Sequence, residues 1–182
     1  MQGWDNLRDD LDNNGSMLGG LTWTISDDTT LAASLITGNE GVGRNQTAYS
    51  LVLTHKLCDR LSYVLQHDLG VAQGEGPRAE WASINQYLLY DWTDDFSTGI
   101  RAEWFRDADG ARVIGLRSGA GGMPSEYTAV SLGAKYKLSS LVTIRAETRW
   151  DIQNRLSGEN FTYSQGRDDN QFVTAVNAII SF

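Results

Sequence analysis

The sequence has no long run of apolar residues, only two prolines and a single cysteine. A transmembrane helix needs about 20 consecutive apolar residues, so a helical membrane protein is excluded. Cys58 has no second cysteine with which to form an internal disulfide, and two scattered histidines do not make a metal-ligand cluster. We therefore expect neither a cofactor nor a metal site.

Positive charge is also scarce, because 15 Lys and Arg residues stand against 23 Asp and Glu residues, for a formal net charge of -8. A general nucleic-acid-binding protein needs a basic surface to neutralise phosphates, so we expect no nucleic-acid partner. The first residues, MQGWDNLRDDLDNNG, lack the basic start and the apolar segment of a secretory signal. That absence is the strongest objection to an exported protein.

The chain does have regular alternation, which is clearest in its last segment, QFVTAVNAIISF. Phe172, Val176, Ile180 and Phe182 fall on one face of a strand, and Asn177 falls on the other. A final strand that stops at a terminal aromatic residue resembles the last strand of a bacterial outer-membrane β-barrel.

Period-2 runs bounded by turn residues predict about nine strands and no helix. Most are about 9–12 residues long, which is enough for a tilted strand to cross a bilayer and more than the usual globular strand. We therefore predict an all-β, antiparallel, up-and-down transmembrane β-barrel. The predicted strands cover 18–26, 30–38, 47–57, 61–72, 81–92, 95–106, 127–138, 141–151 and 171–182.

The connections predict a domain organisation in which short turns alternate with longer loops, as periplasmic turns and external loops do in bacterial barrels. Such barrels have even strand numbers, so an odd count and the missing signal predict the C-terminal part of a larger barrel. Residues 1–17 would then be a polar loop remnant and 18–182 the barrel segment. The long external loops are expected near 39–46, 73–80, 107–126 and 152–170.

Aromatic residues near the strand ends favour a membrane barrel over a soluble antiparallel sheet, which alternation alone does not distinguish. Two interfacial girdles would collect such residues at both ends of the strands. We expect Trp92, Phe96, Tyr136 and Phe182 at the periplasmic end and Trp81, Trp104 and Trp150 at the external end.

If the apolar faces meet lipid, a set of charged residues on three consecutive strands points into the lumen. Opposite charges alternate along and across these strands, so they can pair and hold the wall in register. They can also form a charged constriction that sorts solutes by sign, and both roles can hold together. The predicted lumen-lining residues are Arg101, Glu103, Lys135, Lys137, Arg145, Glu147, Arg149 and Asp151.

The segments IRAEWFRDADGARV (100–113) and VTIRAETRWD (142–151) resemble blocks of the OmpL-like β-barrel porin family of Gram-negative bacteria. The upstream QYLLYDWTDDFSTG resembles that family as well. The resemblance extends from about residue 81 to the end and less closely back to about 18. It implies an outer-membrane barrel acting as a diffusion pore, in a family whose members are usually longer.

We therefore expect an outer-membrane, porin-like channel for passive diffusion of small hydrophilic solutes, with the lipid bilayer and those solutes or ions as partners. A homo-oligomer stays open. The alternatives are a soluble β-barrel that binds a small ligand inside an apolar interior, and a structural outer-membrane barrel that does not conduct.

Enzymatic activity and metal binding are not expected from the remaining candidate residues. His55 and His67 share strand parity with apolar neighbours, which argues against a lumen-facing catalytic dyad. The acids at 107–109 and 168–169 could bind Ca²⁺, but turn-forming acids are the simpler interpretation. The glycine-rich stretch at 119–122 lacks the context of a phosphate-binding loop.

Overall fold

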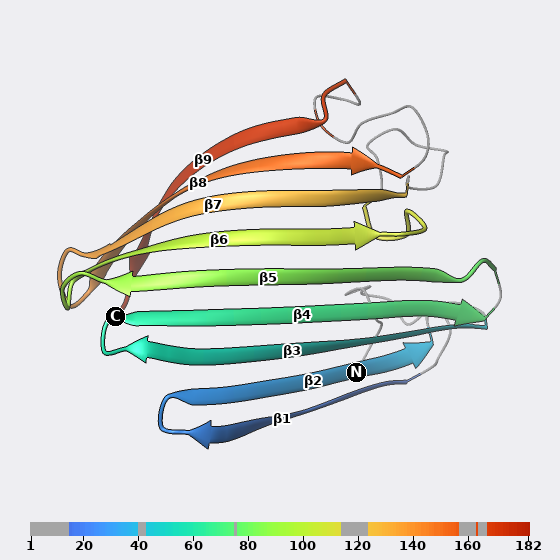
Figure 1. Cartoon of the computed structure of the whole chain (residues 1–182), viewed down its shortest axis with the longest axis horizontal. Helices are drawn as coiled ribbons and strands as arrows, with labels where there is room; N and C mark the ends of the chain where they lie inside the picture. The colour runs from blue at the N-terminus through green and yellow to red at the C-terminus, as the bar shows by residue number, and fades with distance from the viewer. Residues whose placement is uncertain (1–14, 40–42, 75, 114–123, 157–162, 164–166) are drawn as a thin grey trace.

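A computed structural model describes residues 15–39, 43–74, 76–113, 124–156, 163 and 167–182. The described residues form nine strands and no helix (Figure 1). The strands are β1 (Ser16–Ser26), β2 (Thr29–Asn39), β3 (Arg44–Cys58), β4 (Leu61–Gly74), β5 (Ala79–Asp91), β6 (Phe96–Asp107), β7 (Ser125–Lys137), β8 (Val142–Arg155) and β9 (Asn170–Ile180). None of the described residues forms a helix long and apolar enough to span a membrane.

Each strand pairs with the next in an antiparallel meander, in the spatial order β1 to β9. The strands run side by side along the long axis of the molecule, with β1 and β9 at the two edges (Figure 1). Within the described residues the sheet is not closed, because β1 and β9 do not pair with each other. The predicted all-β, up-and-down antiparallel fold is confirmed.

All nine predicted strands are present, and their lengths run from 11 to 15 residues. The main differences lie at the end where the longer loops were expected, which we call the loop end. There β3 begins at Arg44 and β4 continues to Gly74, because Asn45 pairs with Gln73 in the ladder. The connections 40–43 and 75–78 are therefore short, and only 108–124 and 156–169 are long.

The opposite end, which we call the turn end, carries the connections 27–28, 59–60, 92–95 and 138–141. Strand β9 ends at Ile180, two residues before Phe182, although the Ser181 N–H still donates to the Leu141 carbonyl at 2.9 Å. The polar segment 1–14, most of the predicted loop remnant, lies outside the described residues, as do parts of all four predicted loops.

The pairing register sorts the side chains of all nine strands onto two continuous faces, because directly paired residues share a face. Val142 pairs with Ile180 and Trp150 with Phe172 on one face, which we call the apolar face. Lys135 pairs with Arg145 on the other, which we call the polar face. The alternation seen in single strands is thus carried across the sheet, with register shifts in the described strands only near the turn end, between Thr24 and Ser26 and between Lys56 and Cys58.

Burial on the two faces is the reverse of that in a soluble sheet. Large apolar side chains such as Leu132 (55% exposed) and Val176 (70% exposed) stand uncovered on the apolar face. Soluble proteins rarely expose a continuous apolar surface of this extent. Every buried residue of the nine strands lies instead on the polar face: Gly38, Gln46, Gly70, Ala72, Ala79, Ser83, Asp107, Ser125, Ala129, Ser131, Asp151 and Gln153.

Candidate functional site: the polar face of β5 to β9

A chain of ion pairs crosses the polar face from β8 to β6 and back. Arg149 Nε lies 2.5 Å from Asp151 Oδ1, and Arg149 Nη1 lies 2.5 Å from Glu103 Oε2. Glu103 Oε1 in turn lies 3.5 Å from Arg101 Nε, and Arg101 Nη2 lies 3.3 Å from Glu147 Oε1. Five of the eight predicted lumen residues are therefore brought together in one network, which we call the ion-pair ladder.

The ladder can form because β7, the strand between its two sides, carries two small residues on the polar face at this level. Ala129 and Ser131 of β7, each 4% exposed, lie between β6 and β8. Arg101 and Arg149 reach over them, and the Ser131 hydroxyl accepts a hydrogen bond from Arg101 Nη2 at 3.2 Å. Small residues on the middle strand thus permit ion pairs between strands that are not neighbours.

The loop end of β6 is closed by a turn built around Asp107, whose side chain is completely buried. Its carboxylate accepts three backbone N–H groups, from Ala111 at 2.8 Å, Arg112 at 2.8 Å and Val113 at 2.9 Å. The turn passes through Gly110 at a φ of 66°, in the left-handed region that glycine adopts without a steric penalty.

The acids of this turn act as hydrogen-bond acceptors for the backbone. Asp107 is occupied by the three N–H groups, and Asp109 Oδ2 accepts the Glu80 N–H at 2.8 Å. These contacts favour the turn-forming interpretation over a Ca²⁺ site. Among the residues with described positions, no group of three His, Cys, Asp or Glu side chains is placed to hold a metal ion.

The interfacial position expected for Trp81 is wrong, because its side chain lies on the polar face. Trp81 pairs with Gly70 and Asp107, and a Cβ on Gly70 would lie 2.1 Å from the indole ring. The Arg112 guanidinium also lies over the Trp81 ring, 4.9 Å from its centroid. Trp81 therefore packs on the polar face at the loop end, against Gly70 and beside the Asp107 turn.

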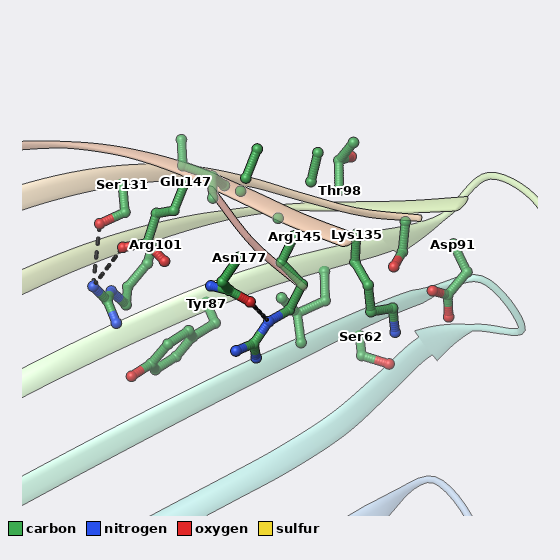
Figure 2. Close-up of a pocket in the computed structure, with 17 residues that line it drawn as sticks. Ser62, Tyr87, Asp91, Thr98, Arg101, Ser131, Lys135, Arg145, Glu147 and Asn177 are labelled. Atoms are coloured by element: carbon green, nitrogen blue, oxygen red, sulfur yellow. Dashed lines mark hydrogen bonds and ion pairs between the residues drawn. The ribbon is translucent and has the colours of Figure 1, made fainter. Parts of the chain in front are cut away.

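The turn-end half of the polar face contains an open pocket of about 490 Å³, lined by residues of every strand from β4 to β9. Because Ser62 of β4 and Asn177 of β9 line the same space, the sheet curls and its polar face is concave. Figure 2 shows Lys135 and Arg145 entering this pocket from neighbouring strands. Arg145 Nε donates to Asn177 Oδ1 at 3.0 Å.

The three remaining predicted lumen residues, Lys135, Lys137 and Arg145, stand apart from the ladder. In the part of the chain that the structure describes, none of them forms an ion pair. Lys137 lies two residues beyond Lys135, on the same face and at the exposed end of β7. The charged set predicted as one group is thus divided into a paired part and an unpaired part.

Aromatic residues on the apolar face gather toward both ends of the strands. At the turn end, the Tyr90 and Trp92 rings contact at 4.6 Å, and Phe96 lies 6.5 Å from Tyr136. Trp23 is also on this face near the turn end, where it pairs with Leu31. At the loop end the apolar face carries Trp104, Trp150 and Phe172.

Both histidines lie on the apolar face, as their parity predicted. His55 pairs with Tyr63, and its Nδ1 is 2.8 Å from the Thr29 hydroxyl. His67 pairs with Ile84 and stacks on Tyr49 with ring centroids 5.6 Å apart. Neither histidine lies on the face that carries the charged network.

Tyr163, in the connection between β8 and β9, is the described group outside the strands whose ionisation is clearly perturbed. Burial, followed by the negative charge of Asp151 and the nearby Tyr127, raises the pKa of Tyr163 to about 12, although the positive charge of Arg149 lowers it. Tyr163 also forms a backbone bridge with Asp168. Sequence reasoning gave no indication of this residue.

A comparison with known proteins gives one family. The family model described as "Putative beta-barrel porin-2, OmpL-like" matches residues 1–182, the whole chain. No curated protein and no solved structure matches the sequence.

Proposed function

The chain belongs to the OmpL-like β-barrel porin family, and from this premise we propose that its concave polar face lines a pore for passive diffusion of small hydrophilic solutes. The family makes it a porin-like protein of the outer membrane. The proposal adds the aqueous pore itself, its lining by the ion-pair ladder and the unpaired cations, and a Gram-negative envelope.

The inverted burial of the sheet is the observation that carries this proposal. A surface of exposed Leu, Val, Ile and aromatic side chains is stable in hydrocarbon, whereas charged and hydrogen-bonded residues need water or each other. The same inverted burial argues against a soluble barrel with an apolar interior. A porin family also indicates a channel rather than an enzyme, and the positions of His55 and His67 on the apolar face agree with that.

Conductance separates a pore from a structural barrel. The protein, folded in detergent and added to planar bilayers in KCl, is expected to give stepwise increases in conductance. Absence of such steps, with a heat-modifiable band on gels showing that the barrel had folded, would favour the structural role.

A matched pair of cysteine variants tests which face lines the pore, in a Cys58→Ser background because Cys58 is exposed. Gly133→Cys lies on the polar face, where a Cβ meets nothing closer than 3.8 Å. Leu132→Cys lies next to it on the apolar face. A charged, water-soluble thiol reagent should lower the conductance of the first variant and leave that of the second unchanged. The opposite pattern would overturn the proposed lining.

A further inference from the structure

Two cations face each other directly in the open pocket of the polar face. Lys135 of β7 and Arg145 of β8 are paired residues in the register. Like charges directly opposite one another destabilise a sheet, and no described carboxylate forms an ion pair with either. In the ladder, by contrast, Arg101 and Arg149 each form ion pairs with acids of β6 and β8. The arrangement at Lys135 and Arg145 therefore costs stability and calls for a role other than holding the wall.

The floor between the two cations and Arg101 is made of glycine. Gly99 and Gly133 pair directly on the polar face. The space above Gly133 is open, since a Cβ there would meet nothing closer than 3.8 Å, whereas the Leu89 side chain lies over Gly99. Glycine weakens a strand interior and often marks a place where another molecule approaches the backbone. In Figure 2 the pocket opens between Lys135 and Arg145 on one side and Tyr87 and Ser62 on the other.

Arg145 is oriented by a neutral partner. Its Nε donates to Asn177 Oδ1 at 3.0 Å, and an amide oxygen does not neutralise the guanidinium charge as a carboxylate would. An oriented guanidinium beside an ammonium group matches the oxygens of a carboxylate or phosphate. We infer that this pocket is an anion subsite, which makes the proposed pore prefer solutes that carry carboxylate or phosphate groups. This inference rests on the proposed pore function.

The acids of the pocket do not cancel its positive charge. Glu147 is engaged by Arg101 at 3.3 Å. Asp91 lies two strands from Lys135 in the same row of the sheet, because both pair with Ser97, and within the described residues it forms no ion pair with Lys135 or Arg145. The whole chain has a formal net charge of -8, so overall charge predicts the opposite selectivity. A preference for anions would thus come from Lys135 and Arg145 locally.

Reversal potentials across bilayers in a KCl gradient measure this preference as the chloride-to-potassium permeability ratio. A unit charge within a few ångströms of a permeating ion in water changes its local concentration about fourfold. Lys135→Gln combined with Arg145→Gln should lower the ratio about tenfold, and Asp91→Asn should raise it. Arg78→Gln removes a charge that is paired with Glu80 at the loop end, so it should leave the ratio unchanged.

Titration of the open channel with succinate and with inorganic phosphate tests whether the subsite binds carboxylate and phosphate groups. Either should reduce the KCl current of the unmodified protein, and neither should do so in the double variant. An unmodified channel that conducts without anion preference, or a preference that survives the double substitution, would overturn the subsite and leave the pore standing. No conductance at all would overturn the pore and the subsite with it. Unchanged heat-modifiability of each variant shows that the barrel has folded.

Discussion

The loop-end and turn-end halves of the polar face are built from the same strands and use their charges differently. At the loop end, Asp107 and Asp151 are buried, the Asp107 carboxylate accepts backbone N–H groups of the turn, and Asp151 forms an ion pair with Arg149. At the turn end, Lys135 and Arg145 lie beside Gly99 and Gly133, and neither forms an ion pair with a described carboxylate. The difference teaches that one half uses its charges in contacts that stabilise the fold, while the other leaves two cations without a carboxylate partner among the described residues, as the proposed anion subsite requires.

The largest effect is expected where burial is greatest, at Asp107. Replacing it with alanine leaves three backbone N–H groups of the 111–113 turn without this acceptor, at a cost of about 3 kcal/mol in the free energy of unfolding. Urea unfolding in detergent micelles, followed by tryptophan fluorescence, measures this. Asp109→Ala removes one exposed hydrogen bond and should cost less than about 1 kcal/mol. Equal costs for both variants would contradict the anchoring role of Asp107.

The ladder should contribute less, because its groups are partly hydrated. A double-mutant cycle on Glu103→Gln and Arg149→Gln, whose side chains are 19% and 34% exposed, should give a coupling free energy of about 1 kcal/mol that falls with added salt. The exposed pair Arg78 and Glu80, at 65% and 50%, is the control and should give about 0.3 kcal/mol. Equal coupling in the two pairs would remove the distinction between the ladder and a surface pair.

Period-2 patterning was sufficient to predict the nine strands and the two faces, because most strand residues alternate and the register preserves that alternation except at the shifts near the turn ends of β1 and β3. It did not predict where β3 begins or where β4 ends, since Asn45 and Gln73 look like loop residues and pair only in the folded ladder. Trp81 was assigned by its nearness to a strand end. Its parity with Ser83 and Tyr87 was the signal that placed it on the polar face.

The division of the charged set could not be predicted from one strand at a time. Glu103 of β6 contacts Arg149 of β8 because the small side chains of Ala129 and Ser131 on β7 leave room between them. This contact depends on the register of three strands. The Asp107 turn depends on backbone N–H groups that carry no residue-specific signal. Local alternation therefore gives the faces, and contacts between distant strands decide which charges are paired.

At the turn end, the effect on stability should be small and of the opposite sign. Lys135→Gln relieves the repulsion from Arg145 and should raise the free energy of unfolding by up to about 0.5 kcal/mol, while it lowers the anion preference of the channel. Urea unfolding beside the reversal-potential measurement shows both effects. A loss of more than about 1 kcal/mol would mean that Lys135 supports the wall, as the ladder residues do.

The smallest effect concerns Tyr163, whose pKa is raised to about 12 chiefly by burial. A tyrosine whose folded pKa lies above its unfolded value near 10 stabilises the fold below about pH 10, and this contribution is lost as the pH rises toward 12. Absorbance titration at alkaline pH should show one late-ionising tyrosine that Tyr163→Phe removes. A late step that persists in the variant would assign it to another residue.

The central claim is that the apolar face meets lipid and the polar face meets water, and accessibility along β8 tests it most directly. Single spin labels at successive positions from 143 to 150, in a Cys58→Ser background and in lipid vesicles, report access to oxygen in the bilayer and to a water-soluble nickel complex. The account predicts strict alternation, with Ala146 and Thr148 open to oxygen and Glu147 open to nickel. The reverse alternation, or nickel access at every position, would contradict it.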